Sequence, residues 1–130
     1  MKKSILILGM TLGSFLGLRA QNEVVIHDWT ALEESAQHID VSYRIVQCQQ
    51  GENGQIQLSI FNENAVAKTI SFSLEITDGN GESATIEFND LSLNIGEMRM
   101  ASCSDYPEIT VDLPTNIDGS SANILIHYGE

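Results

Sequence analysis

Polar and apolar residues alternate most regularly between residues 55 and 77. Apolar side chains occupy every second position from Ile56 to Ile60 and again from Ile70 to Ile76. A period of two puts the two sets of side chains on opposite faces of a β-strand, whereas a helix repeats a face every three or four residues. The intervening Asn62-Glu63-Asn64 contains residues that tolerate tight turns. The pattern therefore predicts two strands joined by a short turn, with one face in a core.

Shorter alternating runs fill most of the remaining chain and predict about eight short strands between residues 23 and 128. Asp78-Gly79-Asn80-Gly81 is a strong turn signal, and Asn89-Asp90 predicts another turn. The run from Ile39 to Cys48 changes register at Ile45 and Val46, which predicts a β-bulge there. No segment is long enough for the crossover helices of a parallel sheet. The fold class is therefore expected to be all-β, a single antiparallel β-sandwich, with a small barrel as the alternative.

One segment, residues 28–38, lacks the alternation. Thr30 and Glu33 fit a helix-capping box. Either a short helix over residues 31–37 or an extended loop is consistent with this segment.

The first 20 residues have the pattern of a secretory signal peptide. Lys2 and Lys3 precede an apolar stretch, and Ala20 offers a small residue for cleavage before Gln21. The apolar stretch is shorter than the ~20 residues of a membrane-spanning helix, although a membrane anchor is the alternative interpretation. The expected organisation is a signal peptide over 1–20 and one domain over 21–130, secreted or periplasmic and without membrane insertion after signal removal.

The chain is strongly acidic, with a formal net charge of −12. Without residues 1–20, three Lys and Arg side chains remain against 18 carboxylates, which gives −15. This charge argues against nucleic acid and against an anionic membrane surface as partners. It serves solubility, or else it attracts a cation or a basic partner.

Two cysteines, Cys48 and Cys103, each end a predicted strand. An even number of cysteines in an exported chain predicts a disulfide. The closed loop of 55 positions is worth about 4 kcal/mol in the chain-entropy model.

The strand that ends in Cys48, followed by Gln55-Ile-Gln-Leu-Ser-Ile-Phe-Asn62, resembles immunoglobulin-like sandwich domains of small secreted bacterial proteins. The later Leu93-Asn-Ile-Gly-Glu97 resembles the leucine-x-proline-glycine-glutamate turn of such domains, with Ile95 in place of the proline. The resemblance extends over residues 39–128 and implies an immunoglobulin-like sandwich of seven to eight strands. Many such domains are of unknown function, so it implies no activity.

Candidate sites are sparse. The aromatic side chains that are free to contact a ligand such as a sugar are Trp29, Phe61 and Tyr106, because the other aromatic residues fall mostly at core positions. The acidic turn of Asp78, Asn80 and Glu82 offers oxygen ligands for Ca²⁺, although it lacks the full calcium-loop signature. His27, His38 and His127 lack zinc-site spacing, so no metal or other cofactor is expected.

No motif of nucleophilic catalysis or phosphate binding is present in the sequence. The chain is therefore expected to be an exported, non-catalytic interaction or accessory module whose partner is another envelope or extracellular protein. The alternative is a small carbohydrate- or calcium-binding module.

Overall fold

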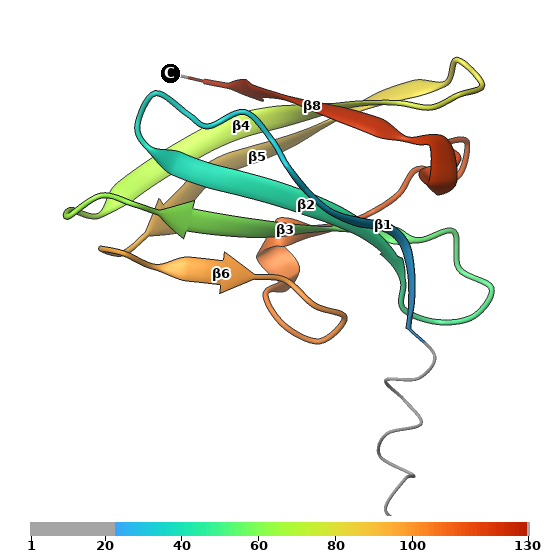
Figure 1. Ribbon diagram of the computed structural model, residues 1–130, viewed down its shortest axis with the longest axis horizontal. Helices are drawn as coiled ribbons and strands as arrows, with labels where there is room; N and C mark the ends of the chain where they lie inside the picture. Colours follow the sequence, from blue (N-terminus) through green and yellow to red (C-terminus); the bar gives the residue numbers. More distant parts are fainter. Residues whose placement is uncertain (1–22, 130) are drawn as a thin grey trace, which may run out of the picture.

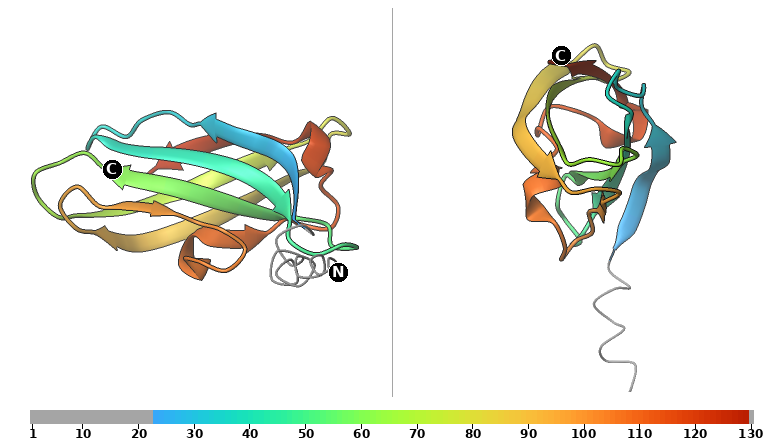
Figure 2. Two further views of the ribbon diagram at one scale, coloured as in Figure 1. Left: turned by 60° about the horizontal axis from the view of Figure 1, so that its bottom comes forward. Right: turned by 90° about the vertical axis from the view of Figure 1, so that its left-hand side faces the viewer.

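The computed structural model describes residues 23–129 as two antiparallel β-sheets that pack face to face. The larger sheet has the strand order β1-β2-β3-β6, and β7 also pairs with β3; the smaller sheet has the order β5-β4-β8. Figures 1 and 2 show the two sheets as two layers. The predicted antiparallel sandwich is confirmed, while the predicted signal peptide, residues 1–20, lies outside the described residues. The strands are β1 (Val24–Ala31), β2 (Ile39–Gln47), β3 (Gln55–Asn62), β4 (Lys68–Thr77), β5 (Ser83–Leu93), β6 (Met98–Met100), β7 (Thr110–Asp112) and β8 (Asn123–Tyr128), with two 3₁₀ turns, η1 (Pro107–Ile109) and η2 (Gly119–Ser121).

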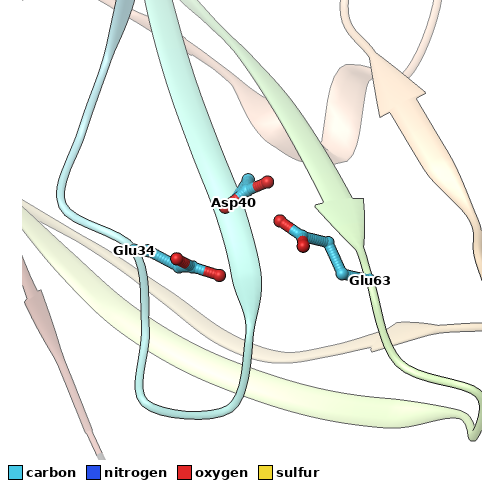
Figure 3. Close-up of side chains that lie close together, drawn as sticks. All are labelled: Glu34, Asp40 and Glu63. Atoms are coloured by element: carbon cyan, nitrogen blue, oxygen red, sulfur yellow. The ribbon is translucent and has the colours of Figure 1, made fainter.

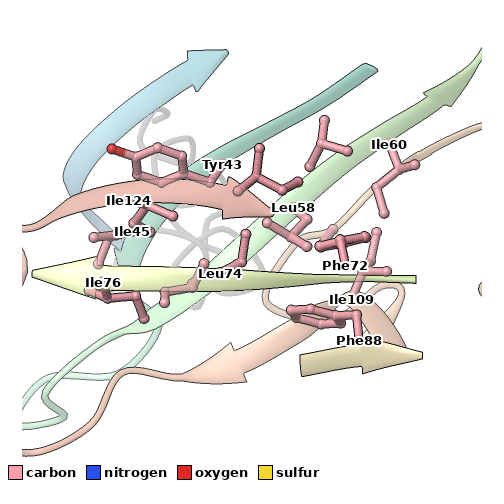
Figure 4. Packing of buried hydrophobic residues seen from close by; sticks show 14 of the residues in the cluster. Tyr43, Ile45, Leu58, Ile60, Phe72, Leu74, Ile76, Phe88, Ile109 and Ile124 are labelled. Atoms are coloured by element: carbon pink, nitrogen blue, oxygen red, sulfur yellow. The ribbon is translucent and has the colours of Figure 1, made fainter. Parts of the chain in front are cut away.

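The core consists of the alternating apolar residues of the central strands. Each sheet directs one set of these side chains inward, and Phe72 and Phe88 of the smaller sheet stack with ring centroids 5.1 Å apart. Figure 4 shows this packing between the sheets. The side chains less than 1% exposed include Ile39, Ile45, Ile56, Leu58, Ile60, Leu74, Ile76 and Ile109. The period of two thus identified the core face of each central strand.

β3 lies in the middle of the larger sheet and is covered on both faces. On its outer face Gln57 is fully buried. The Gln57 oxygen accepts a hydrogen bond from Arg44 Nε at 2.8 Å, and Gln57 Nε2 donates to Gln55 Oε1 at 2.7 Å. The Gln57 amide nitrogen also lies 3.6 Å from the sulfur atoms of both Cys48 and Cys103. A buried amide is stable here because its polar atoms have partners.

The predicted disulfide joins Cys48 to Cys103, with an S–S distance of 2.07 Å. It connects the end of β2 to the loop that follows β6, and so fastens the outer face of the larger sheet over Gln57.

Two details of the predicted strands were wrong. β2 pairs with β3 without interruption, and the irregularities in the pairing of β1 with β2 come from extra residues in β1. Val46 keeps the regular register but is buried on the outer face, so the change of pattern reflects burial of both faces and not a bulge. Asn89 and Asp90 do not form a turn between two strands. They lie within β5, where an extra residue forms a bulge and Asp90 has a φ of 55°.

The segment after β1 is a loop, which confirms the second of the two alternatives for residues 31–37. β1 continues to Ala31, which pairs with Ser42. Beyond it, the buried Ser35 hydroxyl accepts hydrogen bonds from the backbone N–H groups of Gln37 and Ile39. This side chain satisfies the backbone donors that a helix would otherwise satisfy.

Candidate functional site

Three loops meet at the end of the sandwich where β3 finishes, and the fully buried Asn62 holds them together. The Asn62 amide donates to the carbonyl oxygens of Val66, at 3.0 Å, and Asn94, at 2.9 Å. Its side-chain oxygen accepts from the backbone and side-chain nitrogens of Asn64. Asn64 Nδ2 in turn donates to the carbonyl of Gln37, in the loop between β1 and β2. The three loops are therefore fixed relative to one another by buried polar contacts.

The outer face of the larger sheet carries a row of three side chains next to these loops. In the strand register, Phe61 of β3 lies directly opposite Asp40 of β2 on one side and Met98 of β6 on the other. Directly opposed residues project from the same face, with adjacent strands about 4.8 Å apart. We call Asp40, Phe61 and Met98 the outer row. It passes from a carboxylate through an aromatic ring to a thioether.

Two further carboxylates join Asp40 at the acidic end of the outer row. Glu34 comes from the loop after β1 and Glu63 follows β3, and one carboxylate oxygen of each of the three residues lies within 4.8 Å of the others. Figure 3 shows the three side chains directed toward one another from three separate segments. Glu34 also lies 3.6 Å from His38 Nδ1. These residues were not among the site residues predicted from the sequence, because they come from three separate segments.

The electrostatics of this cluster raise the pKa of Glu63. The largest cause is a hydrogen bond with the carboxyl group of Asp40, followed by desolvation and by repulsion from Asp40 and Glu34; His38 opposes the shift. A hydrogen bond between two carboxyl groups needs a proton on one of them, so it favours the protonated form. Within residues 23–129, no Lys or Arg side chain forms an ion pair with these three carboxylates, so the described part of the fold brings like charges together without a strong cation of its own.

Three exposed apolar side chains lie on segments that meet at the same end. Met98 is 53% exposed, Val66 is 54% exposed and Ile95 is 65% exposed. Val66 and Ile95 lie in the loops that Asn62 fastens, and Met98 lies in the outer row. Single exposed apolar residues are common on any protein, but several on fixed neighbouring segments form a surface suited to protein contact.

Arg99 closes the edge between the sheets beside this surface. Its guanidinium contacts Glu97 at 2.9 Å and Glu108 at 3.3 Å, and it donates to the carbonyl of Ser92 in β5. The hydrogen bond with Arg99 and one from the Asn94 backbone N–H lower the pKa of Glu97. The bond to Glu97 likewise raises the pKa of Arg99. Arg99 is thus committed to Glu97, Glu108 and Ser92.

The three aromatic residues predicted to contact a ligand do not form one platform. Trp29 and Phe61 both lie on the outer face of the larger sheet, but the Arg44 guanidinium covers the Trp29 ring at 5.1 Å. Trp29 of β1 lies beside Arg44 of β2, and Phe61 of β3 lies opposite Asp40, four residues away along β2. Since β1 and β3 are also two strand spacings apart, the two aromatic residues are separated by about 16 Å. Tyr106 lies outside the sheets, directly before η1, with a φ of 57°.

The predicted calcium residues belong to a hairpin turn in which the carboxylates of Asp78 and Glu82 already accept hydrogen bonds. Asp78 accepts hydrogen bonds from the backbone N–H groups of Asn80, Glu82 and Asp118. The bond from Asp118 is the main reason why the pKa of Asp78 is lowered. Glu82 accepts from the side-chain amide of Asn116 at 2.8 Å. These contacts join the β4–β5 turn to the loop before η2.

The histidines do not converge. His27 of β1 lies against Tyr43, with ring centroids 5.1 Å apart, whereas His127 of β8 pairs with Glu75 on the outer face of the smaller sheet. A hollow of about 140 Å³ lies beside the disulfide and is lined in part by Gln55, Cys103 and Asp105. Asp105 is its single carboxylate, and it accepts a hydrogen bond from Ser102.

The geometry thus defines a two-sheet, disulfide-linked β-sandwich with an acidic and apolar surface at one end. No protein-family model, curated protein or solved structure matches the chain. Among residues 23–129 there is no helix long and apolar enough to cross a membrane.

Proposed function

We propose that this chain is an exported, non-catalytic interaction module that binds another envelope or extracellular protein at the end of the sandwich marked by Asn62. The immunoglobulin-like resemblance seen in the sequence is part of this proposal, as is the signal peptide. The disulfide supports an oxidising compartment.

The observation that carries the proposal is the fixed presentation of exposed apolar residues by Asn62. Val66, Ile95 and Met98 are each more than half exposed. Asn62 nevertheless bonds the loops of Val66 and Ile95 to each other, and β6 pairs with β3 at Met98. A surface that is ordered before binding loses less conformational entropy when a partner docks. Leu125 of the smaller sheet is as exposed as Met98, at 53%, but it lies opposite Glu75 and outside the loops that Asn62 joins, so it serves as the comparison position.

The alternative, a carbohydrate- or calcium-binding module, has less support. Arg44 covers the Trp29 ring, and the Asp78 oxygens accept backbone hydrogen bonds. Calorimetric titration of the mature protein with Ca²⁺ and with a panel of oligosaccharides tests this alternative directly.

Site-specific photo-crosslinking in intact cells tests the proposed function. A photoreactive amino acid replaces Met98 in one version of the full chain and Leu125 in another, since both positions are 53% exposed. We expect a discrete crosslinked product from Met98 and none from Leu125. Equal crosslinking from both positions, or none from Met98, contradicts a partner-binding surface at this end.

A further inference from the structure

We infer that the partner binds the outer row through a Lys or Arg side chain adjacent to an apolar one, with the cation at Asp40 and the apolar group against Phe61 and Met98. This inference rests on the proposed function and specifies the chemistry of the partner.

The acidic and the apolar side chains of the outer row are directly adjacent. Asp40 lies opposite Phe61, and Phe61 lies opposite Met98, so a carboxylate and two apolar side chains project from the same face within three neighbouring strands. Met100 lies beyond them on β6, opposite Ser59, and is 49% exposed. A methionine side chain is flexible and polarisable and adapts to apolar partners of different shape.

The acidic end of the outer row carries three neighbouring carboxylates. Glu34, Asp40 and Glu63 converge there. Two of the three strong cations after residue 20 are engaged elsewhere: Arg44 bonds Gln57 and Glu23, and Arg99 bonds Glu97 and Glu108. A cation from outside the chain would relieve the repulsion that raises the Glu63 pKa, and its attraction to the carboxylates would be strengthened by partial desolvation.

The outer row fits one kind of occupant better than the others. A second copy of this chain would bring the same carboxylates and the same net charge, −15 without residues 1–20, toward this surface, and like charges across an interface oppose association. A bare metal ion would use the carboxylates and leave Phe61 and Met98 without a role. A segment with a basic and an apolar side chain complements both parts of the outer row.

A binding titration with two synthetic peptides of equal length tests the inference. One peptide contains Lys and Leu and the other contains Glu and Leu, and both are titrated against the full mature protein by calorimetry and by NMR chemical-shift mapping. We expect the Lys-containing peptide to bind, with shifts centred on the outer row. We expect no binding of the Glu-containing peptide.

Matched variants separate specific docking from general attraction to an acidic protein. Asp40→Asn with Glu63→Gln removes two charges at the outer row, and Glu52→Gln with Asp112→Asn removes two exposed charges elsewhere. We expect the first pair to weaken peptide binding at least about tenfold and the second pair to change it less than about twofold. Met98→Ser should also weaken binding, while Leu125→Ser should not.

Equal effects of the two charge pairs, or an unaltered affinity in the Asp40→Asn, Glu63→Gln variant, overturn the inference. So does binding of Ca²⁺ at these carboxylates without binding of the Lys-containing peptide. If the peptide fails while crosslinking remains confined to Met98, the partner chemistry is wrong and the proposed function stands. If crosslinking fails as well, both are wrong.

Discussion

Replacement of Asn62 by alanine tests the mechanism that holds the three loops together. Asn62 is fully buried, and its side chain takes part in four hydrogen bonds, two as donor and two as acceptor. The variant removes all four bonds and leaves two loop carbonyls and the Asn64 nitrogens without this partner. A loss of loop order and of global stability should therefore appear together.

The expected loss is about 2–3 kcal/mol, because a typical hydrogen bond contributes ~1 kcal/mol net and some of the released groups regain water. Native domains are stable by roughly 5–15 kcal/mol, so this is a substantial fraction of the total. For a domain of this size the loss corresponds to a fall in Tm of roughly 8–20 °C.

Urea denaturation followed by circular dichroism measures the effect. The midpoint should fall while the slope m stays constant, since the surface exposed on unfolding hardly changes. Asn116→Ala is the matched control: its side chain makes an exposed hydrogen bond to Glu82, and its loss should cost less than about 0.5 kcal/mol. If the free energy of unfolding of Asn62→Ala lay within about 0.5 kcal/mol of the wild-type value, less than the ~1 kcal/mol of a single hydrogen bond, the assigned role of Asn62 would be refuted.

Three further predictions concern the disulfide and the acidic groups. Reduction of the disulfide should lower the free energy of unfolding by about 4 kcal/mol, and a thiol assay on denatured, unreduced protein should find no free thiol. Glu63→Gln should increase stability at pH 7, because the raised pKa of Glu63 in the folded state means that wild-type stability falls as pH rises through that pKa. Below the ordinary Glu pKa this gain should vanish. The control Glu52→Gln should show no such gain at any pH. Glu97→Gln should instead lower stability at neutral pH, because Arg99 stabilises the ionised Glu97 carboxylate and so lowers its pKa. This contribution is present above the ordinary Glu pKa and is lost as the pH falls through the lowered pKa of the folded state. Urea titrations at several pH values decide both, and a pH-independent difference in either variant would contradict the assigned pKa shift.

The sequence pattern was sufficient for the sheets because burial on one face imposes a period of two. It failed where both faces are covered. Gln57 looked like an ordinary outward polar residue, yet the disulfide and Arg44 bury it completely. Asn62 looked like the first residue of a turn, and nothing in its neighbours distinguishes a buried amide that fastens three loops from an exposed one.

The cluster of Glu34, Asp40 and Glu63 could not be predicted from the sequence pattern, because its members come from three segments. One signal was nevertheless available. A symmetrical hairpin around the loop between Gln47 and Gln55 pairs Asp40 with Asn62, one residue from its actual partner Phe61, and so still places Asp40 near Glu63. The position of Glu34 depends on the bulged β1 and its following loop, whose register no period reveals.

One edge of each sheet, β5 in the smaller sheet and β6 with β7 in the larger sheet, is poorly suited to pairing with a strand of another molecule. The larger sheet ends on one side in two three-residue strands that share β3, separated by the loop that carries Cys103. The longer β5 is interrupted by its bulge at Asp90. An intruding strand from a neighbouring molecule needs a long, straight row of unpaired amides and carbonyls, and neither edge offers one. Crowded copies of the domain are thereby protected at these edges against the runaway strand addition that leads to fibrils.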